Sequence, residues 1–307
     1  MGSEMCIRDR WSTTRPAPSC SYRKPAMADS LAGRTLFITG GSRGIGLAIA
    51  LRAARDGANV ALFAKTAEPH PKLPGTVYTA AEEIEQAGGT ALPIVGDVRD
   101  ADSVASAVEQ AAGRFGGIDI LVNNASAISL TPIEQTEPKR YDLMQSINVR
   151  GTFLATRACI PHLKRSDNGH ILTLSPPINL DPAWLGPHAA YTLSKYGMTL
   201  LTLCAAEELR EAGVAANTLW PRTIIATAAV QNLLGGDEAM SRARTPQIYA
   251  DAAYEILVKP AREYTGQALI DDEVLAAAGV TDLEPYRAAE GDGELIADLF
   301  VDPAPLR

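Results

Sequence analysis

Hydrophobic and polar positions follow two periods along this chain. Short apolar runs, typical of strands buried on both faces, alternate with segments whose apolar residues recur every three or four positions, as in amphipathic helices. The runs begin at residues 34, 59, 90, 118, 169, 215 and 265 and read RTLFITG, NVALFA, TALPIVGDV, IDILVNNA, GHILTLS, AANTLWP and TGQALID. The longest helical pattern covers about residues 189–212. This rhythm predicts an α/β fold: a Rossmann-type doubly wound parallel sheet of about seven strands with helices on both faces.

The periodic part of the chain extends over residues 27–290 and predicts one domain. Residues 1–26 show no apolar periodicity and are expected to be a disordered or non-native tail. Their arginine and serine content also suits a transit peptide, so that alternative stays open. Residues 291–307 are expected to form a C-terminal extension.

Charge and composition narrow the possible partners. The formal net charge is -8, and residues 1–26 carry five basic against two acidic side chains, so the remainder is more acidic still. An acidic domain is a poor partner for nucleic acid or an anionic membrane, and a small-molecule substrate is expected instead. Because no run of about 18 apolar residues and no secretory pattern occurs, we expect an intracellular protein without a membrane span.

The cysteines do not indicate a metal site. Cys6, Cys20, Cys159 and Cys204 have neither metal-ligand spacing nor the density of a disulfide framework. The last two lie in apolar segments and are expected to be buried. We therefore expect no bound metal and a reducing compartment.

A glycine-rich turn follows the first predicted strand and opens the first helix. It reads TGGSRGIG over residues 39–46. Glycines there allow a sharp turn and a close approach of the backbone to a pyrophosphate, whose charge meets the helix N-terminus. A tight strand-to-helix connection alone would use the same residues. The candidate cofactor contacts in this turn are Gly40, Ser42, Arg43, Gly44, Ile45 and Gly46.

The end of the second strand bears on the choice of cofactor. An NAD-binding protein places a carboxylate there to bind the ribose hydroxyls, whereas this chain has Ala64 and Lys65. Lys65 and Arg43 are two cations available to a 2'-phosphate, which favours NADP. The alternative is that both are ordinary surface cations.

Tyr191 and Lys195 lie four residues apart in a helical pattern and therefore share a face. An ammonium beside a phenol stabilises the phenolate and lowers its pKa, which produces a usable general acid. The same spacing also occurs where a tyrosine packs and a lysine is solvated.

The motifs together resemble the short-chain dehydrogenase/reductase family. They are TGGSRGIG, GDV at residues 96–98, NNA at 123–125, INVRG around Asn148 and YTLSK at 191–195, and the resemblance covers about residues 33–272. It implies that residues 27–290 form a dinucleotide-binding and catalytic domain. Tyr191 would donate a proton to the substrate oxygen, Lys195 would hold the nicotinamide ribose and tune Tyr191, and Asn148 would position a water for proton relay.

The resemblance also implies four further cofactor contacts. Asp97 and Val98 would flank the adenine, and Asn123 and Ala125 would lie along the cofactor. Asn123 and Asn148 could instead hold turns or strand ends together.

Two positions depart from the family pattern. The usual active-site serine is the second of a Ser-Ser pair after the fifth strand, and the pair here reads Ser175-Pro176. Ser175 is the remaining candidate hydroxyl, but neighbouring strand residues point to opposite faces. His188 is an alternative polarising group, unless it is a solvated loop histidine.

The second departure follows the sixth strand. The usual Pro-Gly reads Pro221-Arg222, which removes a permissive backbone position beside the nicotinamide. Pro221 is expected at the cofactor, and either Thr223 or Thr227 would replace the family's contact to the cofactor amide.

Further segments resemble a hydroxysteroid dehydrogenase-like branch of the family, among them AKTAEPHPKLPGTVYTAAEEIE and IDDEVL. That branch carries a sterol-carrier lipid-binding domain after its reductase domain and often a peroxisomal address, and neither is expected among these residues. The resemblance implies lipid metabolism in a peroxisome or mitochondrion, or a cytoplasmic protein if no targeting signal acts. It also implies a homodimer or homotetramer that uses the long helix.

Two functions remain in view. One is an NADP-dependent oxidoreductase acting on a carbonyl or alcohol, with an apolar, lipid or steroid-like substrate. The apolar residues expected on the substrate side, which could equally pack a lid, are Trp184, Leu185, Trp220, Ile224, Ile225, Leu233 and Leu234. The alternative is an NADP-binding, lipid-binding module with little turnover, because Pro176 removes a hydroxyl donor.

Overall fold

The computed structural model describes residues 30–301 apart from 70–74, 234 and 292. The tail expected over residues 1–26 and the end of the C-terminal extension lie outside the described residues. No helix among the described residues is long and apolar enough to cross a membrane.

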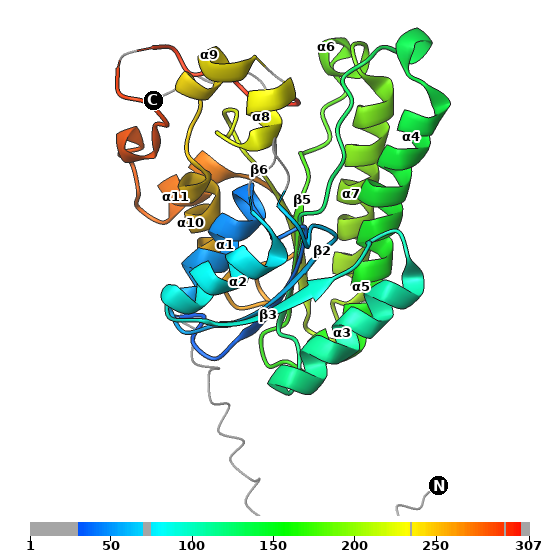
Figure 1. Ribbon diagram of the computed structural model, residues 1–307, viewed down its shortest axis with the longest axis vertical. Helices are drawn as coiled ribbons and strands as arrows, with labels where there is room; N and C mark the ends of the chain where they lie inside the picture. The colour runs from blue at the N-terminus through cyan, green and yellow to red at the C-terminus, as the bar shows by residue number, and fades with distance from the viewer. Residues whose placement is uncertain (1–29, 70–74, 234, 292, 302–307) are drawn as a thin grey trace, which may run out of the picture.

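A single parallel sheet forms the centre of the molecule, which confirms the predicted fold class (Figure 1). Its order is β3-β2-β1-β4-β5-β6-β7. The strands are β1 (Thr35–Thr39), β2 (Asn59–Ala64), β3 (Thr90–Val95), β4 (Ile120–Asn123), β5 (His170–Leu174), β6 (Ala215–Trp220) and β7 (Ala268–Ile270). The order reverses between β1 and β4, and in such sheets the crevice beyond the carboxyl ends at this point is where ligands bind.

Helices cover both faces of the sheet. In Figure 1, α1 (Gly44–Ala54), α2 (Val77–Gln86), α10 (Pro246–Leu257) and α11 (Asp271–Ala277) lie on one side, and α3 (Ala101–Phe115), α4 (Pro138–Met144), α5 (Gly151–Leu163) and α7 (Ala189–Glu208) lie on the other. Shorter helices are α6 (Pro182–Leu185), α8 (Ala228–Leu233), α9 (Gly236–Ser241), the 3-10 turns η1 (Ile133–Gln135) and η3 (Glu284–Tyr286), and the π-helix η2 (Gln145–Arg150).

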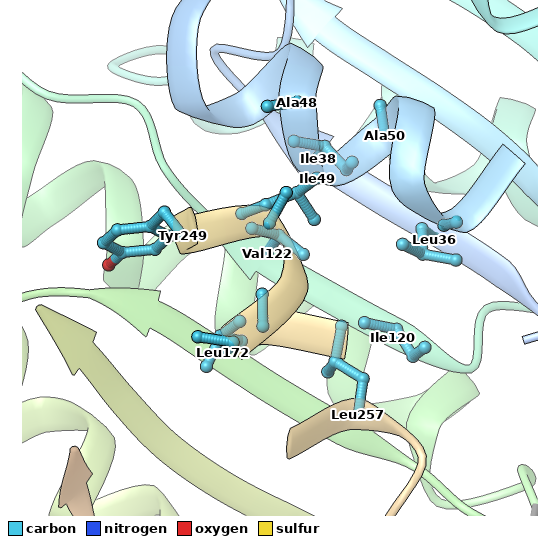
Figure 2. Close-up of a cluster of buried hydrophobic side chains, with 14 of the residues drawn as sticks. Leu36, Ile38, Ala48, Ile49, Ala50, Ile120, Val122, Leu172, Tyr249 and Leu257 are labelled. Atoms are coloured by element: carbon cyan, nitrogen blue, oxygen red, sulfur yellow. The ribbon is translucent and has the colours of Figure 1, made fainter. Parts of the chain in front are cut away.

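The core has one layer on each face of the sheet because successive strand residues point to opposite sides. Leu36 and Ile38 of β1 belong to one layer, whereas Phe37 belongs to the other. Figure 2 shows Ile38 with side chains of neighbouring strands against Ile49 of α1 and Tyr249 of α10. Each such fully buried side chain contributes roughly 1.5–3 kcal/mol of transfer free energy.

One of the two cysteines expected to be buried is exposed on the outer face of α7. Cys159 on α5 is buried as expected, but Cys204 on α7 is exposed. The reason is helical periodicity: Cys204 continues the exposed stripe of Leu193 and Leu200 on the side of α7 turned away from the sheet. Hydrophobic surroundings in sequence therefore do not bury this thiol.

Candidate active site

A cleft of about 1030 Å³ opens beyond the carboxyl ends of the strands. Most of the expected cofactor contacts line it together with both residues of the Tyr-Lys pair. These are Gly40, Ser42, Arg43, Gly44, Ile45, Lys65, Asp97, Val98, Ala125, Tyr191, Lys195 and Pro221. Five expected site residues are not among its lining: Gly46, Asn123, Asn148, Ser175 and Thr223.

The glycine loop leaves a helix N-terminus open toward the cleft. Helix α1 begins at Gly44, its N-cap residue Arg43 makes no capping hydrogen bond through its side chain, and no acidic residue stands in its first turn. The first N–H groups of the helix are thus available to an anion. Gly40 adopts a positive φ of 70°. A cofactor pyrophosphate fits this arrangement of open N–H groups and missing side chains.

Asn124 holds the glycine loop in place, although sequence reasoning selected only its neighbours. Its Nδ2 donates hydrogen bonds of 2.9 Å to the carbonyls of Thr39 and Gly40. A Cβ on Gly46 would lie 2.6 Å from the same nitrogen, so Gly46 serves this contact rather than the cleft. The second asparagine of the NNA motif was the only signal in the sequence.

Asn123 has a role inside the sheet. Its Nδ2 donates to Thr156 on α5 and to Thr173 on β5, each at 3.3 Å. The side chain is buried and joins β4 to both elements. This is the structural alternative raised by the sequence.

Two cations stand where the second strand ends. Arg43 donates from Nη2 to the carbonyl of Gly75 at 3.0 Å, and its buried Nε has no hydrogen-bond partner among the described residues. Lys65 lines the cleft close to Asp97. Hydrogen bonds from Arg99 hold the pKa of Asp97 below its usual range, and the charge of Lys65 adds to this. The loop after β2 therefore packs on the glycine loop through Gly75.

Tyr191 and Lys195 face the cleft from one side of α7. Lys195 donates from Nζ to the carbonyl of Leu174 at 2.9 Å, and its ammonium lies 5.2 Å from the Trp220 ring centroid. Burial lowers the pKa of Lys195 to about 7. Burial also raises the pKa of Tyr191 above its usual value, and the Asp298 carboxylate adds to the rise. The expected lowering of the Tyr191 pKa is thus not seen, because burial disfavours both the ammonium and the phenolate.

Asn148 lies in the π-helix η2 and is fully buried. Its Oδ1 accepts a hydrogen bond from the backbone N–H of Ala127 at 2.7 Å. Its Nδ2 lies 2.9 Å from the Ala127 carbonyl and 2.9 Å from Ser194 Oγ. The side chain therefore ties the loop after β4 to α7, and π-turns of this kind are frequent at functional sites.

Ser175 points toward α7. Its Oγ accepts a hydrogen bond of 2.9 Å from Thr199 Oγ1, which also lies 2.7 Å from the Pro176 carbonyl. The serine is fully buried and stands outside the cleft lining. Tyr191 and Lys195 thus line the same cleft as the glycine loop, whereas Ser175 is buried against α7 outside that cleft.

His188 is buried at the N-cap of α7 and is no solvated loop residue. Its Nδ1 lies 3.0 Å from Thr192 Oγ1, and its ring stands edge-on to Tyr191 with centroids 6.2 Å apart. Burial lowers the pKa of His188, which favours the neutral imidazole.

Both candidate threonines lie in the segment after β6, and only one of them reaches the cleft. Thr227 lines the cleft, whereas Thr223 is fully buried outside its lining. Arg222 turns away toward α11, where its guanidinium binds Asp272 and Glu273. The replacement of the family's glycine thus directs a cation away from the cofactor side.

Residues near the end of the chain reach the site, which no pattern in the sequence indicated. Asp298 and Leu299 line the cleft. The centroid of the Phe300 ring lies 6.1 Å from that of the Tyr191 ring, with 30° between the ring planes. Within the extension expected beyond residue 290, Phe300 therefore packs on α7, and residues 296–298 are held by backbone contacts to Arg222, Thr223 and Arg242.

The apolar residues expected on the substrate side do not all line the cleft. Trp220 and Ile225 line the cleft, and Trp184 packs against Phe300. Leu185 is exposed, and Ile224, which packs with Val230 and Ala243, is not among the residues that line the cleft. The side chains of Leu233 and Leu234 lie outside the described part of the chain.

Similarity to known proteins agrees with this geometry. The family description short chain dehydrogenase matches residues 34–236. The chain is 57% identical over 275 residues to hydroxysteroid dehydrogenase-like protein 2 of Xenopus tropicalis and 54% identical to the Homo sapiens protein of that name. Each match covers 90% of this chain and 65% of the relative, so this chain spans about two thirds of their length.

A solved structure with the same arrangement is a short chain dehydrogenase from Mycobacterium thermoresistibile. It is 65% identical, with a TM-score of 0.84, and the match covers 89% of this chain and 96% of that chain. The resemblance drawn from the motifs is therefore confirmed. The chain belongs to the short chain dehydrogenase family of oxidoreductases.

Proposed function

We propose that this protein is an NADP-dependent oxidoreductase that interconverts a carbonyl compound and its alcohol, with Tyr191 as the general acid and base. The observation that carries the proposal is that Tyr191 and Lys195 line the same cleft as the glycine loop. A hydride donor and a proton donor must reach one substrate carbonyl, and a shared cleft permits this.

The residues present suit a dinucleotide. The N-terminus of α1 would bind the pyrophosphate, and Asp97 with Val98 would border the adenine. Arg43 and Lys65 both line the cleft and would bind the 2'-phosphate through charge-assisted hydrogen bonds. Pro221 and Thr227 would border the nicotinamide. When bound, this cofactor supplies or accepts the hydride at the carbonyl carbon.

The protein's own groups handle the proton. The Tyr191 hydroxyl would donate to the carbonyl oxygen during reduction and accept from the alcohol during oxidation. Its high pKa keeps the phenol protonated at neutral pH, which suits the acid role. Lys195, held at the Leu174 carbonyl, is placed to bind a ribose hydroxyl and to stabilise a phenolate.

The substrate side favours an apolar compound. The Phe300 ring stands beside Tyr191, and the Trp220 ring stands beside Phe300. The names of the curated relatives refer to hydroxysteroids. The neutral His188 is a candidate polarising group in place of the missing serine hydroxyl.

A second candidate function is an NADP-binding and lipid-binding module with little turnover. The observation that favours it is the orientation of Ser175, whose hydroxyl is bound to Thr199 behind the cleft. Removal of one oxyanion donor typically costs about 100- to 1,000-fold in rate. Such a loss slows an enzyme without abolishing its activity.

Oxidation of NADPH in the presence of aliphatic and steroid ketones distinguishes the two functions. The enzyme proposal predicts ketone-dependent oxidation that exceeds the rate with NADPH alone and that disappears in Tyr191→Phe. NADPH binding without oxidation by any ketone or aldehyde of the panel would instead support the binding module.

A further inference from the structure

Phe300 is enclosed by other rings. Its centroid lies 5.3–6.3 Å from those of five side chains, and the ring is almost fully buried. We call these five the aromatic box; they are Trp184, His188, Tyr191, Tyr196 and Trp220. Rings at such separations in tilted or edge-on arrangements attract one another beyond simple burial. Five rings thus surround the space that the flat Phe300 side chain fills.

The backbone at Phe300 is strained. Its φ of +71° makes it the only non-glycine residue with a positive φ among those described. A bulky residue there is strained and persists only where its surroundings hold it. The holding contacts are the hydrogen bonds from Trp220 Nε1 to the Leu299 carbonyl at 2.8 Å and from Asn179 Nδ2 to the Phe300 carbonyl at 3.4 Å. The strain means that release of Phe300 from the box is opposed by less than its packing alone would suggest.

The segment before Phe300 has its own attachment. Thr223 and Ala297 form an antiparallel bridge, and the Asp298 N–H donates to the Arg222 carbonyl at 3.0 Å. These backbone contacts involve residues 297 and 298 rather than the ring. Movement of residues 299–301 out of the box would leave this anchor in place and would break the two hydrogen bonds to the Leu299 and Phe300 carbonyls.

Phe300 covers one side of the Tyr191 ring and is not itself among the residues that line the cleft. Tyr191 is only 5% exposed, with the Phe300 ring against it. A substrate carbonyl has to approach the Tyr191 hydroxyl within hydrogen-bond distance, and the group attached to that carbonyl then lies beside the tyrosine ring. A group that lay on the Phe300 side of the tyrosine ring would compete with Phe300 for the same space.

We propose that the aromatic box is the substrate's apolar subsite, that Phe300 is its internal occupant, and that the substrate is a ketone or aldehyde carrying a ring of about phenyl size near its carbonyl carbon. This inference rests on the proposed function, because only an enzyme converts the ligand that binds in the box. The competition between Phe300 and a ring-bearing ligand is independent of turnover.

Binding of acetophenone to the full chain tests the proposal without catalysis. Tryptophan fluorescence reports the box because Trp184 and Trp220 form two of its walls. Phe300→Ala should lower the Kd for acetophenone at least tenfold relative to the parent and should improve binding of the open-chain ketone 2-octanone much less. Phe153→Ala removes a half-exposed phenylalanine of α5 outside the box and should leave both Kd values unchanged.

Phe300→Leu and the parent itself provide a second measurement if Phe300→Ala does not fold. Leucine is smaller than phenylalanine and has no flat ring, so it occupies less of the box. This variant should therefore bind acetophenone with a Kd between those of the parent and Phe300→Ala. In the parent labelled with fluorotryptophan, saturating acetophenone should shift the ¹⁹F signals of Trp184 and Trp220. Equal Kd values in parent and both variants, or unmoved signals at saturation, would overturn the proposal.

The outcomes separate this inference from the proposed function. Tighter acetophenone binding in Phe300→Ala with no oxidation of NADPH keeps the subsite and refutes the enzyme. Turnover of ketones with acetophenone binding that is insensitive to residue 300 keeps the enzyme and refutes the subsite.

Discussion

Asn124 Nδ2 donates a 2.9 Å hydrogen bond to the carbonyl of Gly40, and with its bond to Thr39 it joins the end of β4 to the glycine loop. The loop is consequently fixed from the neighbouring strand at the point where the sheet order reverses. Its shape is set by this amide as much as by its glycines.

Asn124→Ala should weaken NADPH binding. Two hydrogen bonds of about 1 kcal/mol each are lost, so the Kd should rise roughly tenfold or more. Fluorescence titration with NADPH measures this. Asn59→Ala, at the opposite end of β2 from the cleft, is the control and should keep the parental Kd. An unchanged Kd in Asn124→Ala would mean that the loop holds its shape without the amide.

Lys65→Asp should move cofactor preference from NADP toward NAD. A carboxylate repels the 2'-phosphate and binds the ribose hydroxyls, whereas each charge-assisted contact that Lys65 or Arg43 makes to the phosphate is worth roughly 1.5–3 kcal/mol. Titrations with both cofactors measure the ratio of Kd values, with exposed Lys164→Asp on the far side as control. NADP affinity that survives both Lys65→Asp and Arg43→Ala would refute this cofactor assignment.

Asp298→Asn should shift the pH profile of alcohol oxidation to lower pH. Oxidation needs the Tyr191 phenolate, so its rate rises as pH passes the pKa of Tyr191. The Asp298 carboxylate raises that pKa, and burial raises its own pKa to about 7, so the carboxylate is charged only at higher pH. Removing the negative charge should therefore lower the pKa of Tyr191. The profile of kcat/KM measures the shift; exposed Asp102→Asn should leave it unmoved.

Leu200→Glu should dissociate an oligomer. Leu200 is 55% exposed and Leu193 58% on α7, and Phe153 of α5 is 49% exposed, which is unusual for large apolar side chains on two helices. Burial of this face in a second subunit would account for it. Sedimentation at micromolar concentration with NADPH should give a dimer or tetramer for the parent and a monomer for the variant. A monomeric parent would contradict this expectation.

The sheet could be predicted from the sequence because each strand is buried on both faces and reads as a continuous apolar run. Tyr191 and Lys195 could be placed together because helical spacing is local. Asn124, in contrast, acts through carbonyls about 84 positions earlier in the chain, and an asparagine's partners leave no trace in local pattern. Phe300 was beyond prediction for the same reason, since its box is assembled from residues 80 or more positions before it.

The burial of Tyr191 and Lys195 could not be predicted from the sequence either. The spacing of Tyr191 and Lys195 suggests a lowered phenol pKa, but the sign depends on how much water reaches both groups. Residues 298–300 decide that, because they bring a carboxylate to Tyr191 and cover its ring.

Tyr191→Phe separates proton transfer from cofactor binding, so its turnover and its Kd for NADPH are measured together. The variant loses only the hydroxyl that transfers the proton, so ketone-dependent oxidation of NADPH should fall by at least 100-fold while the Kd for NADPH stays within about twofold of the parent. Exposed Tyr78→Phe is the matched control and should retain parental turnover. Parental turnover in Tyr191→Phe, with any ketone that the parent reduces, would contradict the assignment of this tyrosine as the general acid and base.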